Sequence, residues 1–176
     1  MLYSNSIEAS AFGTYGAQGY GYSIKRLISE IEKIIGIDHC HHVVIIGVGG
    51  LGGALLEHLE FEKYGYHVIA GFDIAPELIG TKVNDVLICS MDDLGRVVKN
   101  HQVEICVLTV PKSAVKQVSL RMKEVGIPAV WNFTNVNLEL GESIAVENID
   151  FIDSLFVLTY YMKKKMNENK KRYMMD

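Results

Sequence analysis

The chain has 176 residues and a formal net charge of −4, and hydrophobic residues make up 49% of it while charged residues make up 22%. This length suits one domain with an appendage, and the composition is that of an ordinary soluble globular protein. No apolar stretch reaches the roughly 20 residues that span a bilayer, and the first residues lack the basic and apolar regions of a signal peptide. We therefore expect a cytoplasmic protein without a membrane partner.

Basic residues are concentrated at the C-terminal end. Residues 163–176, the expected basic tail, hold six of the 17 basic residues and two of the 21 acidic ones. The rest of the chain therefore carries 11 basic and 19 acidic residues. Because a surface this acidic repels phosphate backbones, the composition disfavours specific DNA binding by the chain alone.

The N-terminal part divides into an arm and a helix. Residues 1–22 are dense in Gly, Tyr and Ser and short of large aliphatic residues, which is typical of a loop or arm. From Ser23, a possible cap, apolar residues recur at helical spacing as far as Gly36, which can end the helix. Residues 39–42 then read His-Cys-His-His. Adjacent ligands on an extended chain point to opposite sides, and no second Cys/His pair lies at a zinc-like spacing, so we expect no metal site.

The three cysteines, Cys40, Cys89 and Cys106, are odd in number and scattered along the chain. Two of them lie in apolar runs. We expect reduced, buried thiols rather than a disulfide framework.

Residues 43–53 read V-V-I-I-G-V-G-G-L-G-G and are the most informative stretch of the chain. A buried type of strand runs into Gly47, Gly49 and Gly52, and apolar residues then restart at helical spacing. In such a unit the first glycine makes the turn, the second lets the backbone approach a pyrophosphate, and the third lets the helix pack on the strand. The phosphates would lie on free N–H groups of the helix. Ordinary turn glycines are the alternative.

A second apolar run, residues 67–72, ends in Asp73. This acid lies about 20 residues past the glycines, where the ribose-binding carboxylate of a dinucleotide-binding fold is expected. A carboxylate there disfavours NADP, because it would repel the 2′-phosphate. The spacing therefore favours NAD(H).

The rest of the chain alternates strands and helices. Strands are expected at residues 86–89, 104–108 and 128–133, with helices opening at 91–94 and spanning 112–125. This alternation predicts an α/β fold, a Rossmann-like doubly wound parallel sheet with right-handed crossovers. Ligands of such sheets bind at the carboxyl ends of the strands, marked here by Gly47, Asp73, Thr109 and Asn132.

The last helical segment, residues 149–162, is apolar nearly all round. A terminal helix without a polar face cannot rest on one domain with its other side in water. We expect it to be buried in a partner subunit, which predicts a dimer.

Together these features resemble the redox-sensing transcriptional repressor family Rex, which joins a winged-helix DNA-binding domain to a Rossmann domain that distinguishes NADH from NAD. The resemblance covers about residues 10–161. It rests on F-G-T-Y-G and G-Y-G-Y in the arm, G-V-G-G-L-G-G-A-L, F-D-I-A-P with Gly80, T-V-P at 109–111, Asn132-Phe133, and V-E-N-I-D-F at 146–151. It implies a homodimer that exchanges the terminal helix, with Phe151 near the nicotinamide and Asp150 in the hinge.

The expected organisation is a remnant arm at 1–22, an NAD(H)-binding Rossmann domain at 23–148, a domain-swapped dimerisation helix at 149–162 and a basic tail at 163–176. The expected cofactor-binding residues are Gly47, Val48, Gly49, Gly50, Leu51, Gly52, Asp73, Ile74, Thr109, Val110, Pro111, Asn132 and Phe151.

Departures from the family decide the expected function. The winged-helix domain is almost wholly absent, and residues 6–13 and 18–22 lack the family's basic positions. The N-F-A-P-V pattern has become N-F-T-N-V at 132–136. These replacements favour a natural regulator that does not bind DNA by itself and acts through a full-length relative or another protein partner.

No catalytic residue is expected. Hydride-transfer enzymes need an acid near the nicotinamide, and no histidine lies near the strand ends apart from those flanking the first strand. A separate substrate domain is also missing. The alternative is a small NAD-dependent oxidoreductase or a protein that binds CoA or another nucleotide, since the same fold serves all of these.

Overall fold

The computed structural model describes residues 24–173. The expected arm at 1–22, with its F-G-T-Y-G and G-Y-G-Y motifs, and the expected cap Ser23 lie outside the described residues. The chain divides into two units, residues 1–40 and 41–176, which are described separately.

The described part of the first unit is helix α1 (Ile24–Ile35), which begins and ends within a residue of the predicted bounds. Isoleucine and leucine recur every three or four residues along it, so they share one face. This face is open, and the helix contains no buried residue. The exposed apolar residues are Ile24, Leu27, Ile28, Ile31, Ile34 and Ile35.

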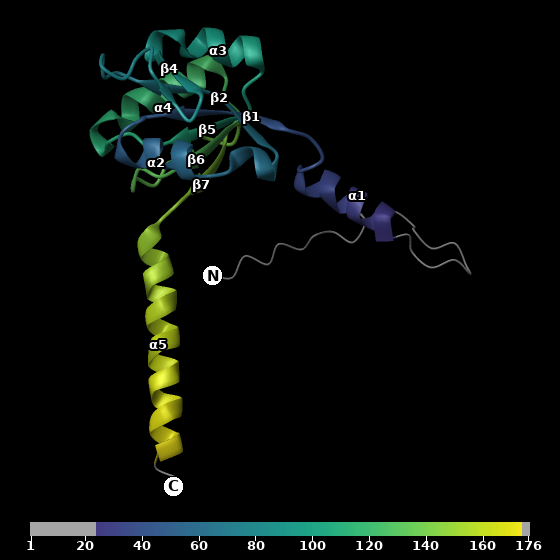
Figure 1. The fold of residues 1–176 in the computed structure, drawn as a ribbon, viewed down its shortest axis with the longest axis vertical. Coiled ribbons are helices and arrows are strands. Elements are labelled where there is room, and N and C mark those ends of the chain that lie inside the picture. Colours follow the sequence, from purple (N-terminus) through teal and green to yellow (C-terminus); the bar gives the residue numbers. More distant parts are fainter. Residues whose placement is uncertain (1–23, 174–176) are drawn as a thin grey trace, which may run out of the picture. The chain divides into compact units, whose positions relative to one another are not determined.

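The second unit is built on a sheet of seven strands in the order β3-β4-β2-β1-β5-β6-β7. All neighbouring strands are parallel except β3 and β4, which form an antiparallel hairpin. This sheet confirms the predicted Rossmann-like fold (Figure 1). The strands are β1 (His41–Ile46), β2 (Tyr66–Asp73), β3 (Lys82–Val83), β4 (Val86–Ser90), β5 (Ile105–Leu108), β6 (Ala129–Asn132) and β7 (Ala145–Asn148).

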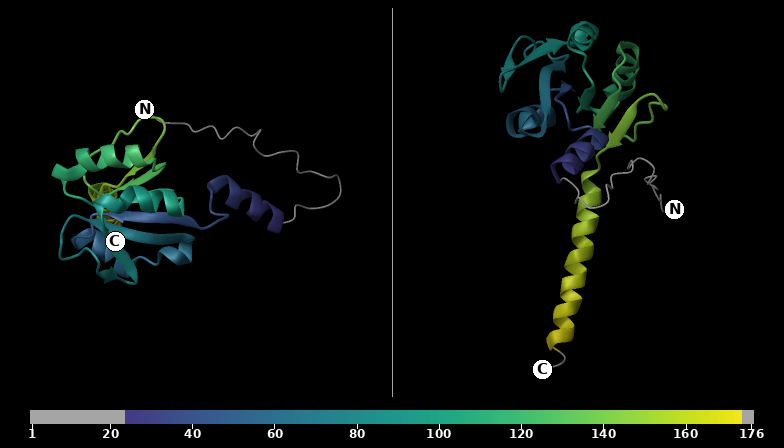
Figure 2. Two further views of the ribbon diagram at one scale, coloured as in Figure 1. Left: turned by 90° about the horizontal axis from the view of Figure 1, so that it is seen from above. Right: turned by 90° about the vertical axis from the view of Figure 1, so that its right-hand side faces the viewer.

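Helices cover the two faces of the sheet unequally. The first strand β1 shows this, because Val44 and Ile46 belong to one core cluster and Val43 and Ile45 to the other. The first cluster holds residues of α3 (Leu94–His101) and α4 (Val115–Val125); the second holds residues of α2 (Gly50–His58) and the 3-10 turn η2 (Phe61–Tyr64). Figures 1 and 2 show α3 and α4 on the face opposite α2. Two further turns, η3 (Met91–Asp93) and η4 (Lys112–Ala114), lead into α3 and α4.

Two strands lie outside the prediction. The edge strand β3 has only two residues, too few for an apolar alternation to show. The opposite edge strand β7 has a single large apolar residue, Val146, and no helix precedes it. Both strands owe their existence to pairing with a neighbour rather than to local propensity.

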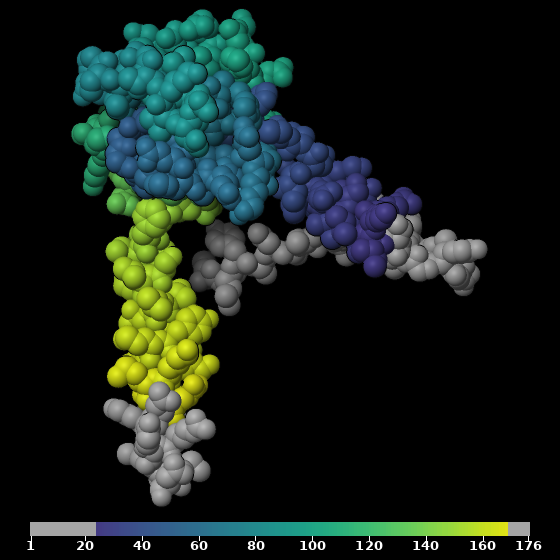
Figure 3. All heavy atoms as spheres, in the orientation of Figure 1, coloured from purple at the N-terminus to yellow at the C-terminus, as the bar shows by residue number. Residues whose placement is uncertain are grey.

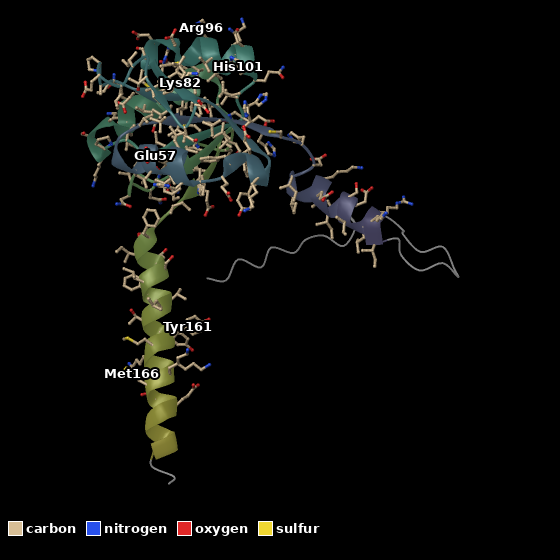
Figure 4. The ribbon with its side chains drawn as sticks, in the orientation of Figure 1. Glu57, Lys82, Arg96, His101, Tyr161 and Met166 are labelled. Carbon is tan, nitrogen blue, oxygen red and sulfur yellow. The ribbon has the colours of Figure 1, made fainter. Side chains whose placement is uncertain are left out.

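Helix α5 (Phe151–Tyr173) is longer than predicted, because residues 163–173, expected as a tail, continue it. Asp150 begins it, with Oδ1 accepting a hydrogen bond from Ile152 N at 2.8 Å. The large apolar side chains of the helix are uncovered, and Tyr161 and Met166 project away from it (Figures 3 and 4). They are Phe151, Ile152, Leu155, Phe156, Val157, Leu158, Tyr160, Tyr161, Met162 and Met166. None of the described helices is long and apolar enough to cross a membrane.

The cysteines are all free, as expected, but they differ in burial. Cys106 is buried in β5, and burial raises the pKa of its thiol far above the usual range. Cys89 is half-buried. This partial burial, and after it the negative charge of Asp93, raises the pKa of the Cys89 thiol. The expectation of burial was wrong for Cys40, which is exposed because it precedes the first strand.

Candidate nucleotide-binding site

The glycine loop after β1 is held by both neighbouring strands. Gly47 turns the chain with φ +96°, a conformation that favours glycine. Its N–H donates to Phe72 O of β2 at 2.8 Å, and its carbonyl accepts from Thr109 Oγ1 at 2.6 Å. The loop is therefore fixed across the carboxyl ends of three strands before any ligand arrives.

The glycines fall into two groups according to the space around them. A Cβ on Gly52 would lie 2.0 Å from Gly47 O, and one on Gly47 would lie 2.9 Å from the Thr109 carbonyl carbon. These two positions exclude any side chain. By contrast, a Cβ on Gly49 or Gly50 would meet nothing within 4 Å. The open glycines are thus not required by internal packing, and the space beside them is not filled by the protein.

Helix α2 begins inside this loop. Its N-cap is Gly49, no side chain caps its first turn, and that turn carries no acidic residue. The first N–H groups of a helix lack partners within the helix, and its dipole places partial positive charge there. This end of α2 can therefore bind an anion without a Lys or Arg side chain.

Asp73 closes the site on the β2 side. Its Oδ2 accepts a hydrogen bond from Val48 N at 2.7 Å, and its Oδ1 accepts from Ile74 N at 2.8 Å and Ala75 N at 2.9 Å. The sequence predicted that Asp73 binds the ribose of a dinucleotide. The structure adds that its carboxylate fixes the glycine loop. A carboxylate has about four acceptor positions, so one remains for a hydroxyl group of a ligand. Ile74 beside it is 81% exposed.

The segment after β5 forms the other side. Thr109 Oγ1 lies near both Gly47 O and Ile46 O, and the Val110 side chain would touch a Cβ on Gly47. Pro111 then begins the turn η4 as its N-cap. The structure thus brings the expected residues of the glycine loop together with Asp73 and Thr109.

Asn132 has a different position from these residues. Its side chain is 2% exposed, and Nδ2 donates to Val136 O and to Asn148 Oδ1, each at 2.7 Å. Oδ1 accepts from Thr134 N at 3.1 Å and Thr134 Oγ1 at 2.7 Å. Both amide hydrogens are therefore used within the protein, and the side chain supports the loop after β6. A contact with the cofactor stays a prediction.

Sequence reasoning missed Thr134 and Asn148 as members of this network. Asn132 and Asn148 are register partners at the ends of β6 and β7. Two asparagines at neighbouring strand ends were a usable signal, but only once β7 was known to exist. The altered N-F-T-N-V pattern left the role of Thr134 open. In the structure its backbone N–H and its hydroxyl both donate to the side-chain oxygen of Asn132.

Phe151 lies in an aromatic row that leads from β6 into α5. Its ring centroid is 6.0 Å from that of Phe133, which is 4.6 Å from that of Trp131. Phe133 is buried while Phe151 is 54% exposed. The open side of the Phe151 ring is available for another flat group, and its place beside a nicotinamide stays a prediction.

The histidines at the start of β1 have protein partners. His41 Nδ1 lies 2.8 Å from Glu104 Oε2, and His42 Nδ1 donates to His101 O at 2.5 Å. The absence of a metal from this run stays a prediction.

Known proteins with the same sequence features are transcriptional repressors. Residues 38–136 match the family described as CoA binding domain. The redox-sensing transcriptional repressor Rex of Clostridioides difficile (strain 630) is 39% identical over 157 residues, which are 89% of this chain and 75% of that protein. Rex of Caldicellulosiruptor bescii is 41% identical over 160 residues, 91% of this chain and 74% of that protein. The chain belongs to the Rex family.

Solved Rex structures agree with the fold described above. The crystal structure of RSP, a Rex-family repressor, is 32% identical and superimposes with a TM-score of 0.77, covering 88% of this chain and 74% of RSP. RSP in complex with β-NADH gives a TM-score of 0.74 over 86% of this chain and 73% of RSP. The Rex relatives are named as repressors rather than as enzymes, in agreement with the expected lack of catalytic activity.

The close approach of Gly52 to Gly47 leads to a stability prediction with a matched control. Gly52→Ala places a methyl group against the Gly47 carbonyl and should lower the free energy of unfolding by about 3 kcal/mol. Gly53→Ala, whose Cβ would have Val48 O at 3.9 Å as its nearest neighbour, should raise it by about 0.5–1 kcal/mol because alanine favours the helix. Urea unfolding measures both. Equal stabilities would contradict the described packing of α2 on β1.

Proposed function

We propose that this chain is a cytoplasmic NAD(H)-binding redox sensor of the Rex type that passes its signal to a protein partner. The observation that carries the proposal is the open cradle at Gly49 and Gly50, formed by the uncapped first turn of α2 beside Asp73. The solved complexes of the relative RSP, one with β-NADH and one with β-NAD+ and operator DNA, support it.

In this proposal the dinucleotide lies across the strand ends. Residues 47–52 hold the pyrophosphate on backbone N–H groups, and Asp73 accepts a hydrogen bond from the adenosine ribose. Ile74 lies beside the adenine, while residues 109–111, Asn132 and Phe151 belong to the nicotinamide half. Hydride chemistry belongs to the bound nucleotide; these residues bind and orient it and distinguish its oxidation states.

Gly49→Val tests this placement in the full chain. Because a Cβ at Gly49 meets nothing within 4 Å, the variant should keep the wild-type free energy of unfolding in urea to within about 1 kcal/mol. The new side chain occupies the pyrophosphate space, so NADH affinity should fall at least about tenfold, or 1.4 kcal/mol, by calorimetric titration. Unchanged affinity would exclude the glycine loop as the site, and wild-type protein that binds neither NADH nor NAD at several hundred micromolar would refute the function.

A second candidate ligand is CoA, which the matched family's description favours. CoA also presents an adenosine and a pyrophosphate, so the same loop could hold it. Titration with CoA and mass spectrometry of the purified protein distinguish the two. Retained CoA, or CoA binding tighter than that of NADH, would replace the sensor proposal.

We further propose that the chain is a homodimer in which the subunits exchange α5. The helix exposes large apolar side chains on every side, from Phe151 to Met166. A soluble monomer rarely exposes an apolar patch beyond roughly 300–600 Å², so this helix calls for a covering surface. A second copy of the chain can bury this surface, because a symmetric contact covers the α5 helices of both subunits at once.

Charge substitutions on α5 test the dimer without shortening the chain. Leu155→Asp combined with Leu158→Asp should give a monomer by light scattering, because each carboxylate would be buried unpaired in the contact. The control Lys164→Asp with Lys165→Asp introduces the same residue on the polar part of the helix and should leave the dimer intact. A wild-type monomer, or a dimer that survives the leucine substitutions, would contradict the exchange.

These 176 residues, we propose, do not bind an operator specifically. The segment before Lys25 contains no Lys or Arg, and six of the 17 basic residues lie within 163–172. Each phosphate contact contributes close to one unit of salt dependence, so a cluster without a base-reading element gives weak binding that salt removes.

A gel shift with the operator of a full-length Rex relative, at physiological salt and with excess non-specific competitor, measures this. We expect no sequence-specific shift with or without NAD(H). A shift that survives the competitor would refute the prediction.

A further inference from the structure

A second hollow lies away from the glycine loop, between α4 and the loop at residues 136–140. It is a groove of about 480 Å³. Its apolar part comes from Val115, Leu138 and Leu140, and its rim carries Lys112, Lys116 and Lys123. Folding does not require lysines to line an apolar groove, because a lysine side chain can reach water from any part of the surface.

The spacing on α4 puts the rim and an apolar contact on one stripe. Lys116, Leu120 and Lys123 follow at intervals of four and three residues, so they lie above one another on the helix. Leu120 is 56% exposed although it borders the apolar base. Lys112 extends the stripe from the preceding turn η4. The groove therefore offers alternating positive charge and apolar surface along one line.

The charges of the groove are unbalanced. Its lining holds three lysines and one acid, Glu139, in a chain whose net charge is −4. None of the three lysines makes an ion pair with any of the described residues. Neighbouring cations behave differently: Arg121 Nη1 is 3.1 Å from Glu124 Oε2, and Arg96 Nη2 is 2.8 Å from Asp93 Oδ1. The positive charge of the groove is therefore not balanced by ion pairs with the described residues.

Ser119 adds a polar group to this lining. Its side-chain oxygen is buried and has no hydrogen-bond partner among the described residues. A buried hydroxyl without a partner costs stability and is rare in folded proteins. This oxygen is closed to the groove, so the positive charge of the rim, and not Ser119, is what a ligand rich in carboxylates would complement.

We infer that the groove binds an acidic peptide segment of a partner protein that carries leucine-like side chains between its carboxylates. The apolar side chains rest on Leu120, Leu138 and Leu140, and the carboxylates meet the lysines of the rim. A nucleic acid would match the lysines but not the apolar base. The inference gives the partner of the proposed function a docking surface, yet it does not depend on nicotinamide binding.

Fluorescence anisotropy of the full chain tests this with a defined probe, a fluorescein-labelled twelve-residue peptide of alternating Leu and Glu. Lys116→Glu combined with Lys123→Glu should weaken binding at least about tenfold, and Leu120→Asp should have a similar effect. The control Lys82→Glu with Lys99→Glu makes the same charge change at residues that do not line the groove and should weaken binding less than about twofold, because solvent and salt screen these charges from the bound peptide. Figure 4 labels Lys82 on the second unit.

Three results with the peptide probe would overturn the inference. They are the absence of binding to the wild-type chain, equal losses in the two double variants, and unchanged affinity when glycine replaces leucine in the probe. Tighter binding of a single-stranded oligonucleotide at the same lysines would also overturn it. NADH titration of every variant separates this outcome from that of the sensor proposal, since a failed groove with intact NADH binding refutes the docking surface alone.

Discussion

The contact between the Gly47 carbonyl and the backbone of Gly52 is the constraint on which the rest of the site depends. It brings the first turn of α2 against the end of β1 so closely that no side chain fits between them. Two side chains from neighbouring strands hold this geometry: Asp73 accepts from Val48 N, and Thr109 donates to Gly47 O. The N–H groups of α2 are therefore aimed by rigid strands rather than by a mobile loop, which is the condition for anion binding without charged side chains.

The sequence predicted this part of the molecule well because its signals are local. An uninterrupted apolar run, glycines at fixed intervals and an acid after the next strand each follow from backbone geometry within a few residues. The part that it did not predict depends on contacts across the chain. Strand β7 forms by pairing with β6, and the Asn132 amide then turns to Asn148 and Val136. A side chain at the correct strand end therefore supports a loop, which no periodicity could have shown.

The helices at the two ends of the described chain, α1 and α5, show another limit of local signals. Apolar spacing correctly predicted α1 and α5. Such a pattern indicates that a helix surface must be buried, but it does not indicate which other surface buries it. In α1 the apolar residues share one face, so a single contact would suffice. In α5 they surround the helix, so a single flat surface cannot cover them. The predicted end at Met162 was too early. The three lysines directly after it are exposed to solvent, but lysine also has a high helix propensity, and the helix continues through them.

The nucleotide site and the lysine groove are joined by a short stretch of chain. Thr109 holds the glycine loop, Pro111 caps the turn η4, and Lys112 in that turn borders the groove. Proximity along the chain does not by itself couple two sites; coupling requires that the ligand of one site prefers one of two arrangements of this stretch. If the peptide affinity differs between NADH-bound and free protein, NADH affinity must change by the same factor when the peptide binds, since the linkage is reciprocal. Equal affinities would make the groove a tether for the partner, and unequal ones would make it the output of the sensor.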